Sequence, residues 1–377
     1  MSTVISILIF LVIFGVLVVV HEGGHFLIAR AGGIRVNEFM VGFGPKLLNK
    51  KKNGTLYSIR LLPFGGACVF DGMPGLEDEE DEEEAQPESA FTPDGGFVQE
   101  QMTKEEEAPG VPFKEAKVWG RIATVFAGPL FNFLLAFVAS IIVTAFSVWD
   151  YPVVTGFSED SPALAAGLAK GDRIISMDGE RIYLSNEVRL KSKFNEGEAI
   201  RIVADRNGEE ITAEFVPSWS EQDARYYMGI TLGEYGEVKG AQILPYAFHN
   251  MGYYVKWTYK SLGLLVTGRL GMDALSGPVG MVQMVDETYE ASSRYGMSAV
   301  LLSMTELLLL LSVNLAIVNL LPIPGLDGGR LLFLFIEVIR GKPIPPEKEG
   351  YVHIAGVIAL VALMVFVLFK DIVRWVG

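Results

Sequence analysis

Cysteine is almost absent from this 377-residue sequence. Cys68 is alone, so the chain can form no intrachain disulfide and no cluster of cysteine metal ligands. Charged residues are also scarce, at 20% against 50% hydrophobic residues, and the mean hydropathy is +0.34. This composition excludes an ordinary soluble enzyme and predicts several membrane spans.

Positive charge is the rarer sign, because 31 Lys and Arg residues face 45 Asp and Glu residues and give a net charge of −14. The stretch from Glu77 to Glu107 holds 14 acidic residues and one lysine, and so carries −13 of that charge. Like charges at this density cannot bury a core. We therefore predict an acidic, disordered cytoplasmic insertion at 76–118, with a solvated insertion of no particular role as the alternative. We expect no nucleic-acid partner.

Long apolar runs predict four transmembrane helices. The first run lacks the basic start and the small-residue cleavage site of a signal peptide, so we expect it to be retained. Lys and Arg flank the runs unevenly, which predicts cytoplasmic loops at 32–75 and 331–353 and both termini outside. The predicted helices are 1–31, 119–149, 299–330 and 354–377.

Residues 150–220 read as a compact β-rich domain, with short alternating runs separated by Asp178-Gly179 and Asn207-Gly208 turns. The run from Ser161 to Ile182 resembles the helix, turn and strand of PDZ domains found in bacterial proteases. In such domains an extended peptide can pair with an exposed strand edge. The alternative is a small domain that only spaces or shields the membrane part. Residues 221–298 contain interleaved aromatic and basic residues, which predict a linker and interfacial amphipathic helices.

A membrane-associated β-ribbon is predicted within 32–75, where Thr55–Phe70 follow the Asn53-Gly54 hairpin signal. Backbone at membrane depth must be paired or must face a cavity. We therefore expect the ribbon to offer an edge to a substrate, with Ser58 and Arg60 as substrate-binding residues. The predicted fold is a polytopic α-helical membrane protein with four transmembrane helices, this β-ribbon and an inserted extracytoplasmic PDZ-like β-rich domain.

Histidine occurs only four times, and two of the four stand in the sequence His21-Glu22-Gly23-Gly24-His25. On a helix this H-E-x-x-H pattern places two imidazoles on one face, one turn apart, with the carboxylate beside them. Ionisable residues inside an apolar span are costly and usually functional. The pattern predicts a metal site, and a buried structural cluster of the same residues is the alternative.

A third ligand is needed for a catalytic metal site of this kind. Near the end of the third predicted span, Pro322, Pro324 and Gly325 break the helix shortly before Asp327. Such a break at membrane depth is tolerated where it lines a cavity. The predicted topology places Asp327 on the same leaflet as the histidines, so we expect it to be the third ligand; an ordinary Asp-Gly turn is the alternative.

These motifs together make the chain resemble the site-2 protease family of intramembrane zinc metalloproteases, in its bacterial sigma-factor-regulating branch. The resemblance covers nearly the whole chain. The motifs that carry it are His21–His25, Gly42-Phe43-Gly44-Pro45, Phe64-Gly65-Gly66, Ala127-Gly128-Pro129-Leu130-Phe131-Asn132, the PDZ-like run, Ser276-Gly277-Pro278-Val279-Gly280 and the segment from Asn319 to Asp327.

The resemblance implies a role for each of five residues. His21, His25 and Asp327 would bind Zn2+, Glu22 would be the general base, and Asn319 would hold or polarise the substrate. The sequence departs from the family pattern in two ways, so the resemblance is a weaker guide to substrate selection than to the chemistry. Some relatives carry two tandem PDZ domains where one is found here, and the acidic run is no part of the family motifs.

The predicted function is an intramembrane zinc metalloendopeptidase in the bacterial plasma (inner) membrane, with the active site near the cytoplasmic side. Its substrates would be single-span proteins already cut by another protease, such as anti-sigma factors, or remnant signal peptides. Membrane lipids are the other expected partners. The alternatives are a catalytically silent adaptor that binds peptides through the PDZ-like domain and holds metal only as a staple, and a metal transporter, for which Glu306 is the only further ionisable candidate within the spans.

Overall fold

The computed structural model describes residues 3–72, 108–221, 225–271 and 275–376. Most of the predicted acidic insertion therefore lies outside the described residues. The chain divides into two compact units. The first unit comprises Met1–Leu135, Asp273–Glu287 and Asn314–Gly377, and the second comprises Ala136–Met272 and Thr288–Val313.

In the described residues, four helices are long and apolar enough to cross a membrane, in agreement with the four predicted spans. At about 1.5 Å per residue, the 29 residues of the first rise about 43 Å, more than the roughly 30 Å of a hydrocarbon core. The four candidate membrane-spanning helices are α1 (Thr3–Ala31), α3 (Val118–Phe146), α8 (Met297–Asn319) and α10 (Pro346–Val376).

The third and fourth spans differ from the predicted ranges. Helix α8 ends at Asn319 rather than 330, and a separate helix, α9 (Asp327–Arg340), occupies much of the predicted loop at 331–353. Prolines interrupt the chain between the two helices, and buried Leu331 and Leu334 give α9 an apolar face that a loop would not need. Helix α10 likewise begins at Pro346, before the predicted start at 354.

The ribbon consists of two long strands, β1 (Val36–Lys52) and β2 (Thr55–Phe70), which pair in more than one register. Residues 36–41 pair with 66–70 and also with 56–59, while residues 46–52 pair with 55–60. Four segments thus lie side by side in the order 66–70, 36–41, 55–60 and 46–52. The two outer segments of this small sheet are therefore 66–70 and 46–52.

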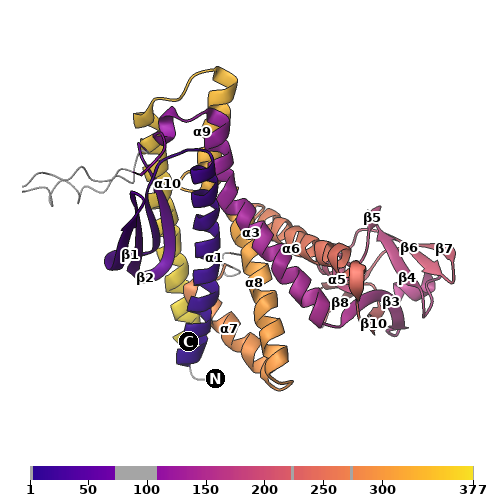
Figure 1. Cartoon of the computed structure of the whole chain (residues 1–377). Helices are drawn as coiled ribbons and strands as arrows, with labels where there is room; N and C mark the ends of the chain where they lie inside the picture. Colours follow the sequence, from indigo (N-terminus) through magenta and orange to yellow (C-terminus); the bar gives the residue numbers. More distant parts are fainter. Residues whose placement is uncertain (1–2, 73–107, 222–224, 272–274, 377) are drawn as a thin grey trace, which may run out of the picture. The chain divides into compact units, whose positions relative to one another are not determined.

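The ribbon runs beside the C-terminal half of α1 (Figure 1). The ring of Phe26 contacts Phe39 and Tyr57, with centroids 5.5 and 5.8 Å apart. A buried core continues from the end of α1 through the ribbon to the short helix η1 (Phe113–Glu115) and to α3 and α9. Its members are Ala29, Ile34, Val36, Cys68, Phe70, Phe113, Ile122, Val125, Leu331 and Leu334. This core fixes α1, α3 and α9 around a common centre.

The second unit contains a six-stranded sheet in the order β10-β3-β4-β6-β7, with β5 paired to β4. The sheet extends beyond the predicted domain end at 220, because its last strand, β10, pairs with its first, β3. The strands are β3 (Trp149–Phe157), β4 (Arg173–Met177), β5 (Glu180–Arg181), β6 (Ile200–Arg206), β7 (Glu209–Phe215) and β10 (Ile230–Gly236), beside a small hairpin of β8 (Ser218–Ser220) and β9 (Arg225–Tyr227).

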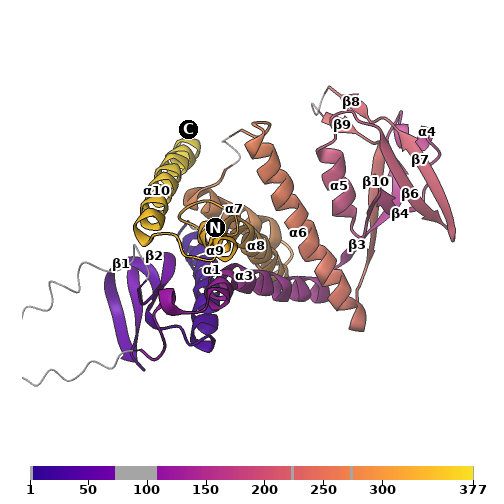
Figure 2. The ribbon, with the colours of Figure 1, turned by 90° about the horizontal axis from the view of Figure 1, so that it is seen from above.

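Helices α4 (Pro162–Ala165) and α5 (Ser185–Lys193) accompany this sheet (Figure 2). Helix α6 (Ile243–Val266) follows the turn η2 (Gly240–Gln242). An aromatic contact and an ion pair connect α6 to the β-rich domain. The ring centroids of Trp149 and Tyr246 are 4.7 Å apart, and Lys256 of α6 forms an ion pair with Glu187 at 2.9 Å. Helix α7 (Pro278–Ser293) precedes α8 in the chain. Glu306, the remaining ionisable candidate, accepts a hydrogen bond from Tyr254 of α6 at 2.5 Å, as an interhelical residue does.

Candidate metal centre

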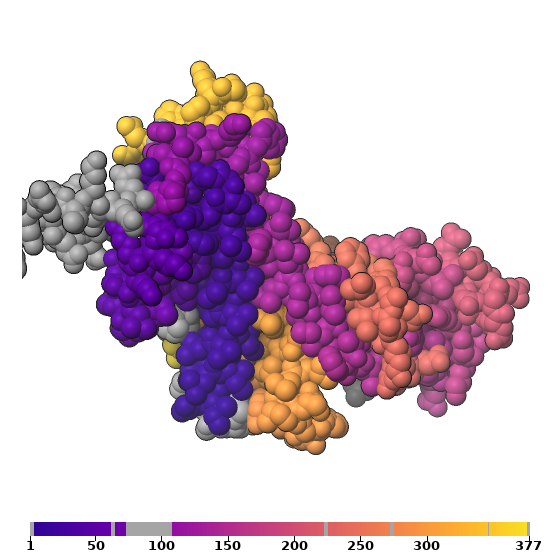
Figure 3. All heavy atoms as spheres, in the orientation of Figure 1, coloured from indigo at the N-terminus to yellow at the C-terminus, as the bar shows by residue number. Residues whose placement is uncertain are grey.

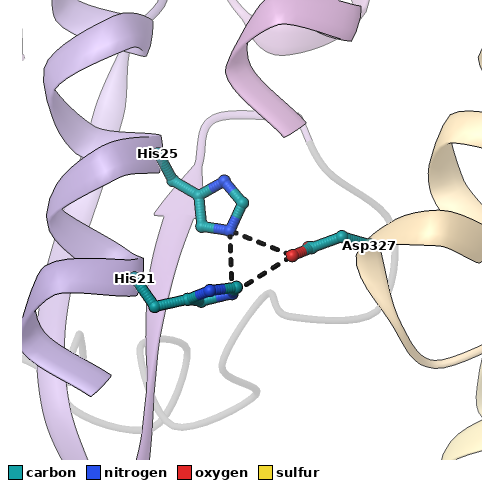
Figure 4. Close-up of side chains that lie close together, drawn as sticks. All are labelled: His21, His25 and Asp327. Carbon is teal, nitrogen blue, oxygen red and sulfur yellow. Dashed lines mark hydrogen bonds and ion pairs between the residues drawn. The ribbon is translucent and has the colours of Figure 1, made fainter. Parts of the chain in front are cut away.

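Two imidazoles of α1 face the same point. His21 and His25 lie one helical turn apart and are only 7% and 6% exposed. Their Nε2 atoms are 3.3 Å apart, and their rings meet edge to face at 88° (Figure 4). The predicted H-E-x-x-H geometry is therefore present, with both Nε2 atoms directed to one side of the helix.

Asp327 brings a carboxylate to the same point from the first residue of α9. Its Oδ2 lies 3.1 Å from Nε2 of His21 and 3.4 Å from Nε2 of His25 (Figure 4). The turn before it is very tight, since a Cβ atom on Gly328 would lie 2.1 Å from the carbonyl oxygen of Leu321. Glycine is needed there to let α9 begin with its acidic residue facing α1.

The three atoms fit a zinc ion. Ligands about 2.0–2.1 Å from a tetrahedral zinc are separated by roughly 3.3 Å, and the three observed separations are 3.1, 3.3 and 3.4 Å. Two neutral imidazole nitrogens that present lone pairs and one carboxylate oxygen repel one another at such distances unless a proton or a metal ion lies among them. Two histidines and one acidic residue also form a known ligand set of catalytic zinc sites, which leaves a further position for water or substrate.

Helix α3 holds the opposite edges of both imidazoles. Nδ1 of His25 lies 2.8 Å from the carbonyl oxygen of Thr124, and a carbonyl oxygen only accepts, so this nitrogen carries the proton and Nε2 is left for a metal. The side-chain amide of Asn132, itself fully buried, lies 3.1 Å from Nδ1 of His21. These contacts fix the ring orientations in the way expected of metal-binding histidines.

Sequence reasoning assigned no role to Thr124, Gly128 or Asn132, although it quoted the last two in a motif. A Cβ atom on Gly128 would lie 2.3 Å from Nε2 of His25 and 2.9 Å from Cε1 of His21. The three residues recur every four positions on α3 and therefore share one face. Small and polar residues at this spacing in an apolar span were the signal that could have identified them.

The close approach of α1 and α3 also explains why one residue of the Gly23-Gly24 pair is a glycine. A Cβ atom on Gly24 would lie 2.5 Å from the carbonyl oxygen of Ala127, whereas one on Gly23 would meet nothing within 4 Å. Helix α1 remains α-helical through both glycines. Gly24 is thus required for helix contact, and Gly23 is not.

Glu22 lies on the ribbon side of α1. The side chain is 9% exposed and accepts a hydrogen bond from the backbone of Cys68. A Cβ atom on Gly66 would approach Cγ of Glu22 to 3.2 Å. The outer ribbon segment 66–70 therefore passes directly beside the predicted general base.

The other three predicted site residues have different surroundings. Asn319 is half-buried at the last residue of α8. Ser58 is buried and donates a hydrogen bond to Glu38, and Arg60 donates to both carboxylate oxygens of Glu38 at 3.2 and 3.3 Å. Both residues lie in the inner segment 55–60, which has strand neighbours on each side.

Known proteins share extensive sequence similarity with this chain. The family model for peptidase family M50 matches residues 9–363. A zinc metalloprotease RasP of Geobacillus kaustophilus is 34% identical over 431 residues, with 99% of both chains covered. The regulator of sigma-W protease RasP of Bacillus subtilis is 32% identical with the same coverage, and a probable protease eep of Enterococcus faecalis is 31% identical with 100% of both chains covered.

Among solved structures, the PDZ domain of an SdrC-like protein from Listeria monocytogenes matches 23% of this chain and 90% of its own length, with 23% identity and a TM-score of 0.21. The family match is far more extensive, since residues 9–363 include His21, His25 and Asp327 and nearly every helix in the described part of the chain. The resemblance to site-2 proteases found in the sequence is thereby confirmed, and the chain belongs to peptidase family M50.

Proposed function

We propose that this chain hydrolyses peptide bonds within the transmembrane segments of single-span proteins, with His21, His25 and Asp327 as zinc ligands and Glu22 as general base. The chain is a zinc metalloprotease, as its family and relatives indicate. The observation that carries the assignment of residues is the convergence of three possible ligand atoms within 4.8 Å of one another. Two of them belong to buried imidazoles of α1, the helix that also bears Glu22, and the third belongs to the Asp327 carboxylate at the start of α9.

His21, His25 and Asp327 would hold the zinc ion, which would supply Lewis-acid polarisation of the scissile carbonyl and of the attacking water. Glu22 takes the proton as the water oxygen attacks the carbonyl carbon, and it returns that proton to the amine nitrogen as the C–N bond breaks. The Cys68 backbone hydrogen bond holds the Glu22 carboxylate in place for both transfers. The α3 contacts hold both imidazole rings in place, and the one to the Thr124 carbonyl oxygen leaves Nε2 of His25 free for a metal.

A transmembrane helix has its backbone amides paired internally, so a substrate must be locally extended before attack. The outer segment 66–70 supports this step, because an added strand there would lie beside Glu22. This replaces our expectation of pairing at Ser58 and Arg60, whose side chains are engaged with Glu38. We retain Asn319 as the residue that holds or polarises the substrate, since its amide can both donate and accept.

The proposed location is the bacterial plasma membrane, with the metal centre near the cytoplasmic side and the β-rich domain outside. The proposed substrates have lost most of their outer domain to another protease, as anti-sigma factors do in the cascade that the sequence resemblance implies. The relative in Bacillus subtilis is named a regulator of sigma-W protease, which supports this class of substrate.

The test is cleavage of a single-span substrate by the purified wild-type protein and by Glu22→Gln, with bound zinc measured in both. We expect about one zinc per chain in each protein and cleavage by the wild type alone, because glutamine cannot accept the proton. A version of the substrate with its outer domain intact should be cleaved far more slowly. Zinc-loaded wild type that cleaves neither version would favour the adaptor, and cleavage by Glu22→Gln would remove Glu22 from its role.

A further inference from the structure

The distribution of charge in the ribbon differs from that of the rest of the chain. From Phe39 to Phe70 there is no Asp or Glu, whereas the whole chain has a net charge of −14. The basic residues of this stretch are Lys46, Lys50, Lys51, Lys52 and Arg60, and Arg60 forms an ion pair with Glu38. Three of the lysines, Lys50–Lys52, are consecutive and exposed, and we call them the lysine edge.

The lysine edge lies near the end of the first span. In the ribbon register Lys50 is opposite Tyr57, and the ring of Tyr57 contacts Phe26, five residues before the end of α1. The opposite end of the ribbon lies deeper along α1, because a Cβ atom on Gly66 would come within 2.9 Å of Val18. The lysine edge is therefore level with the end of an apolar span, where headgroups are expected.

Exposed apolar side chains lie farther along the same ribbon, toward the middle of α1. Leu47 and Leu48 are 57% and 68% exposed, and Phe43 is 48% exposed. At about 3.3 Å per residue, Leu48 lies roughly 13 Å from Lys52 along the strand. Figure 3 shows this part of the ribbon on the molecular surface beside α1. Apolar residues that would enter hydrocarbon are thus joined to a row of cations at the headgroup level.

We propose that the lysine edge binds the headgroups of anionic phospholipids and thereby fixes the depth of the ribbon in the membrane. Three adjacent lysines near an anionic surface give a substantial attraction, roughly fivefold in partition for each lysine. The partner is a lipid surface rather than a protein, because the lysines are level with the end of the apolar span and the exposed apolar residues lie toward its middle. The other outer segment of the same sheet, 66–70, would then be held at a fixed height beside Glu22.

The direct test measures which lipid surrounds the ribbon. Asn49 is exposed and directly precedes the lysine edge, so a dye attached to Asn49→Cys reports the lipids at this location. Cys68 is the chain's only cysteine and is buried, and wild type treated with the same dye measures any labelling of Cys68. Vesicles of phosphatidylcholine and phosphatidylglycerol are prepared at one composition, with quenching bromines carried either by the phosphatidylglycerol or by the phosphatidylcholine. We expect the dye to be quenched about twofold or more strongly when phosphatidylglycerol carries the bromines than when phosphatidylcholine does. This difference should disappear at high salt, which screens the attraction between the lysines and the headgroups.

In the Asn49→Cys background, Lys50→Gln, Lys51→Gln and Lys52→Gln together should abolish the preference, and the three Lys→Arg changes should retain it. The matched control removes the same charge from three other exposed lysines of the same unit, Lys117, Lys342 and Lys348, and should leave the preference intact. Equal quenching by the two brominated lipids, or an equal loss in the control, would overturn the proposal. Neither result depends on peptidase activity, so the proposed function is tested separately.

Discussion

At Gly24 and Gly128 the absence of a side chain lets α1 and α3 approach closely enough to build the candidate metal centre. Each of these glycines faces an atom that a Cβ would overlap, a carbonyl oxygen of Ala127 in one case and Nε2 of His25 in the other. The centre thus depends on residues that contribute no ligand. The imidazoles are positioned from behind by Thr124 and Asn132, so their orientation is a property of α3 as much as of α1.

Gly128→Ala should displace His25 and His21, because the new Cβ would lie 2.3 Å from Nε2 of His25. We expect zinc affinity to fall by about 10–100-fold, the range seen when the residues that orient metal ligands are changed. Gly120→Ala on the same helix is the control, since a Cβ there meets nothing within 4 Å. Competition with a chelating dye measures both affinities. Equal zinc affinity in the two variants would show that the close approach at Gly128 is unimportant.

At the level of single residues, the sequence predicts best those side chains whose relation follows from their spacing within one segment. The His21 and His25 pair was readable because residues four apart share a helix face, and Asp327 followed from the span topology and the proline break. Asn132 and Thr124 were not assigned because they touch the imidazoles across a helix contact, and no spacing within one segment encodes that contact. The same reason placed substrate binding at Ser58 and Arg60, whose Glu38 partner comes from another part of the ribbon.

Among the elements, the long apolar helices were predicted well and the sheets less well. A run of twenty apolar residues identifies a span without reference to the rest of the chain. Strand β1 was not read as a strand over its full length, because Gly44-Pro45 and the lysine run interrupt its pattern. Strand β10 was missed as part of the β-rich domain because its partner, β3, lies more than seventy residues earlier in the chain. Pairing over such distances is decided by tertiary packing.

Within the β-rich domain, strand β6 is tied to the turn before β4 by Arg206 and the buried carboxylate of Asp172, 2.7 Å apart. The Arg206 hydrogen bonds hold the pKa of Asp172 below its usual value. Its contribution to stability is therefore complete above about pH 4, where the unfolded side chain ionises, and is lost as the pH falls further through the folded pKa.

Asp172→Asn should lower the free energy of unfolding of this domain by roughly 1.5–3 kcal/mol at neutral pH. The loss relative to wild type should shrink in acid, because the wild-type carboxylate is then protonated. Urea unfolding followed by hydrogen exchange of β6 and β7 in the full chain measures the change. Glu237→Gln removes an exposed acidic residue that pairs with Lys239 and should have no measurable effect. Equal stability of Asp172→Asn and wild type at pH 7 would contradict the assignment.

In the whole molecule, the candidate metal centre joins segments about three hundred residues apart in the sequence. His21 and His25 come from α1 and Asp327 from α9, and all three belong to the first unit. The second unit contains the β-rich domain and none of these ligands. Metal binding by these three residues would therefore be coupled to the packing of the first unit, while the second unit has its own core in the sheet.

Removal of zinc by a chelator should consequently loosen only the first unit. We expect faster hydrogen exchange around the C-terminal half of α1 and at the start of α9, because the repulsion among the three ligand atoms is no longer offset. Exchange in β4, β6 and β7 should remain unchanged. Zinc added back should restore slow exchange in the wild type, and also in Glu22→Gln, which keeps all three ligands. A uniform increase in both units, or none in the first, would show that the metal does not hold α9 against α1.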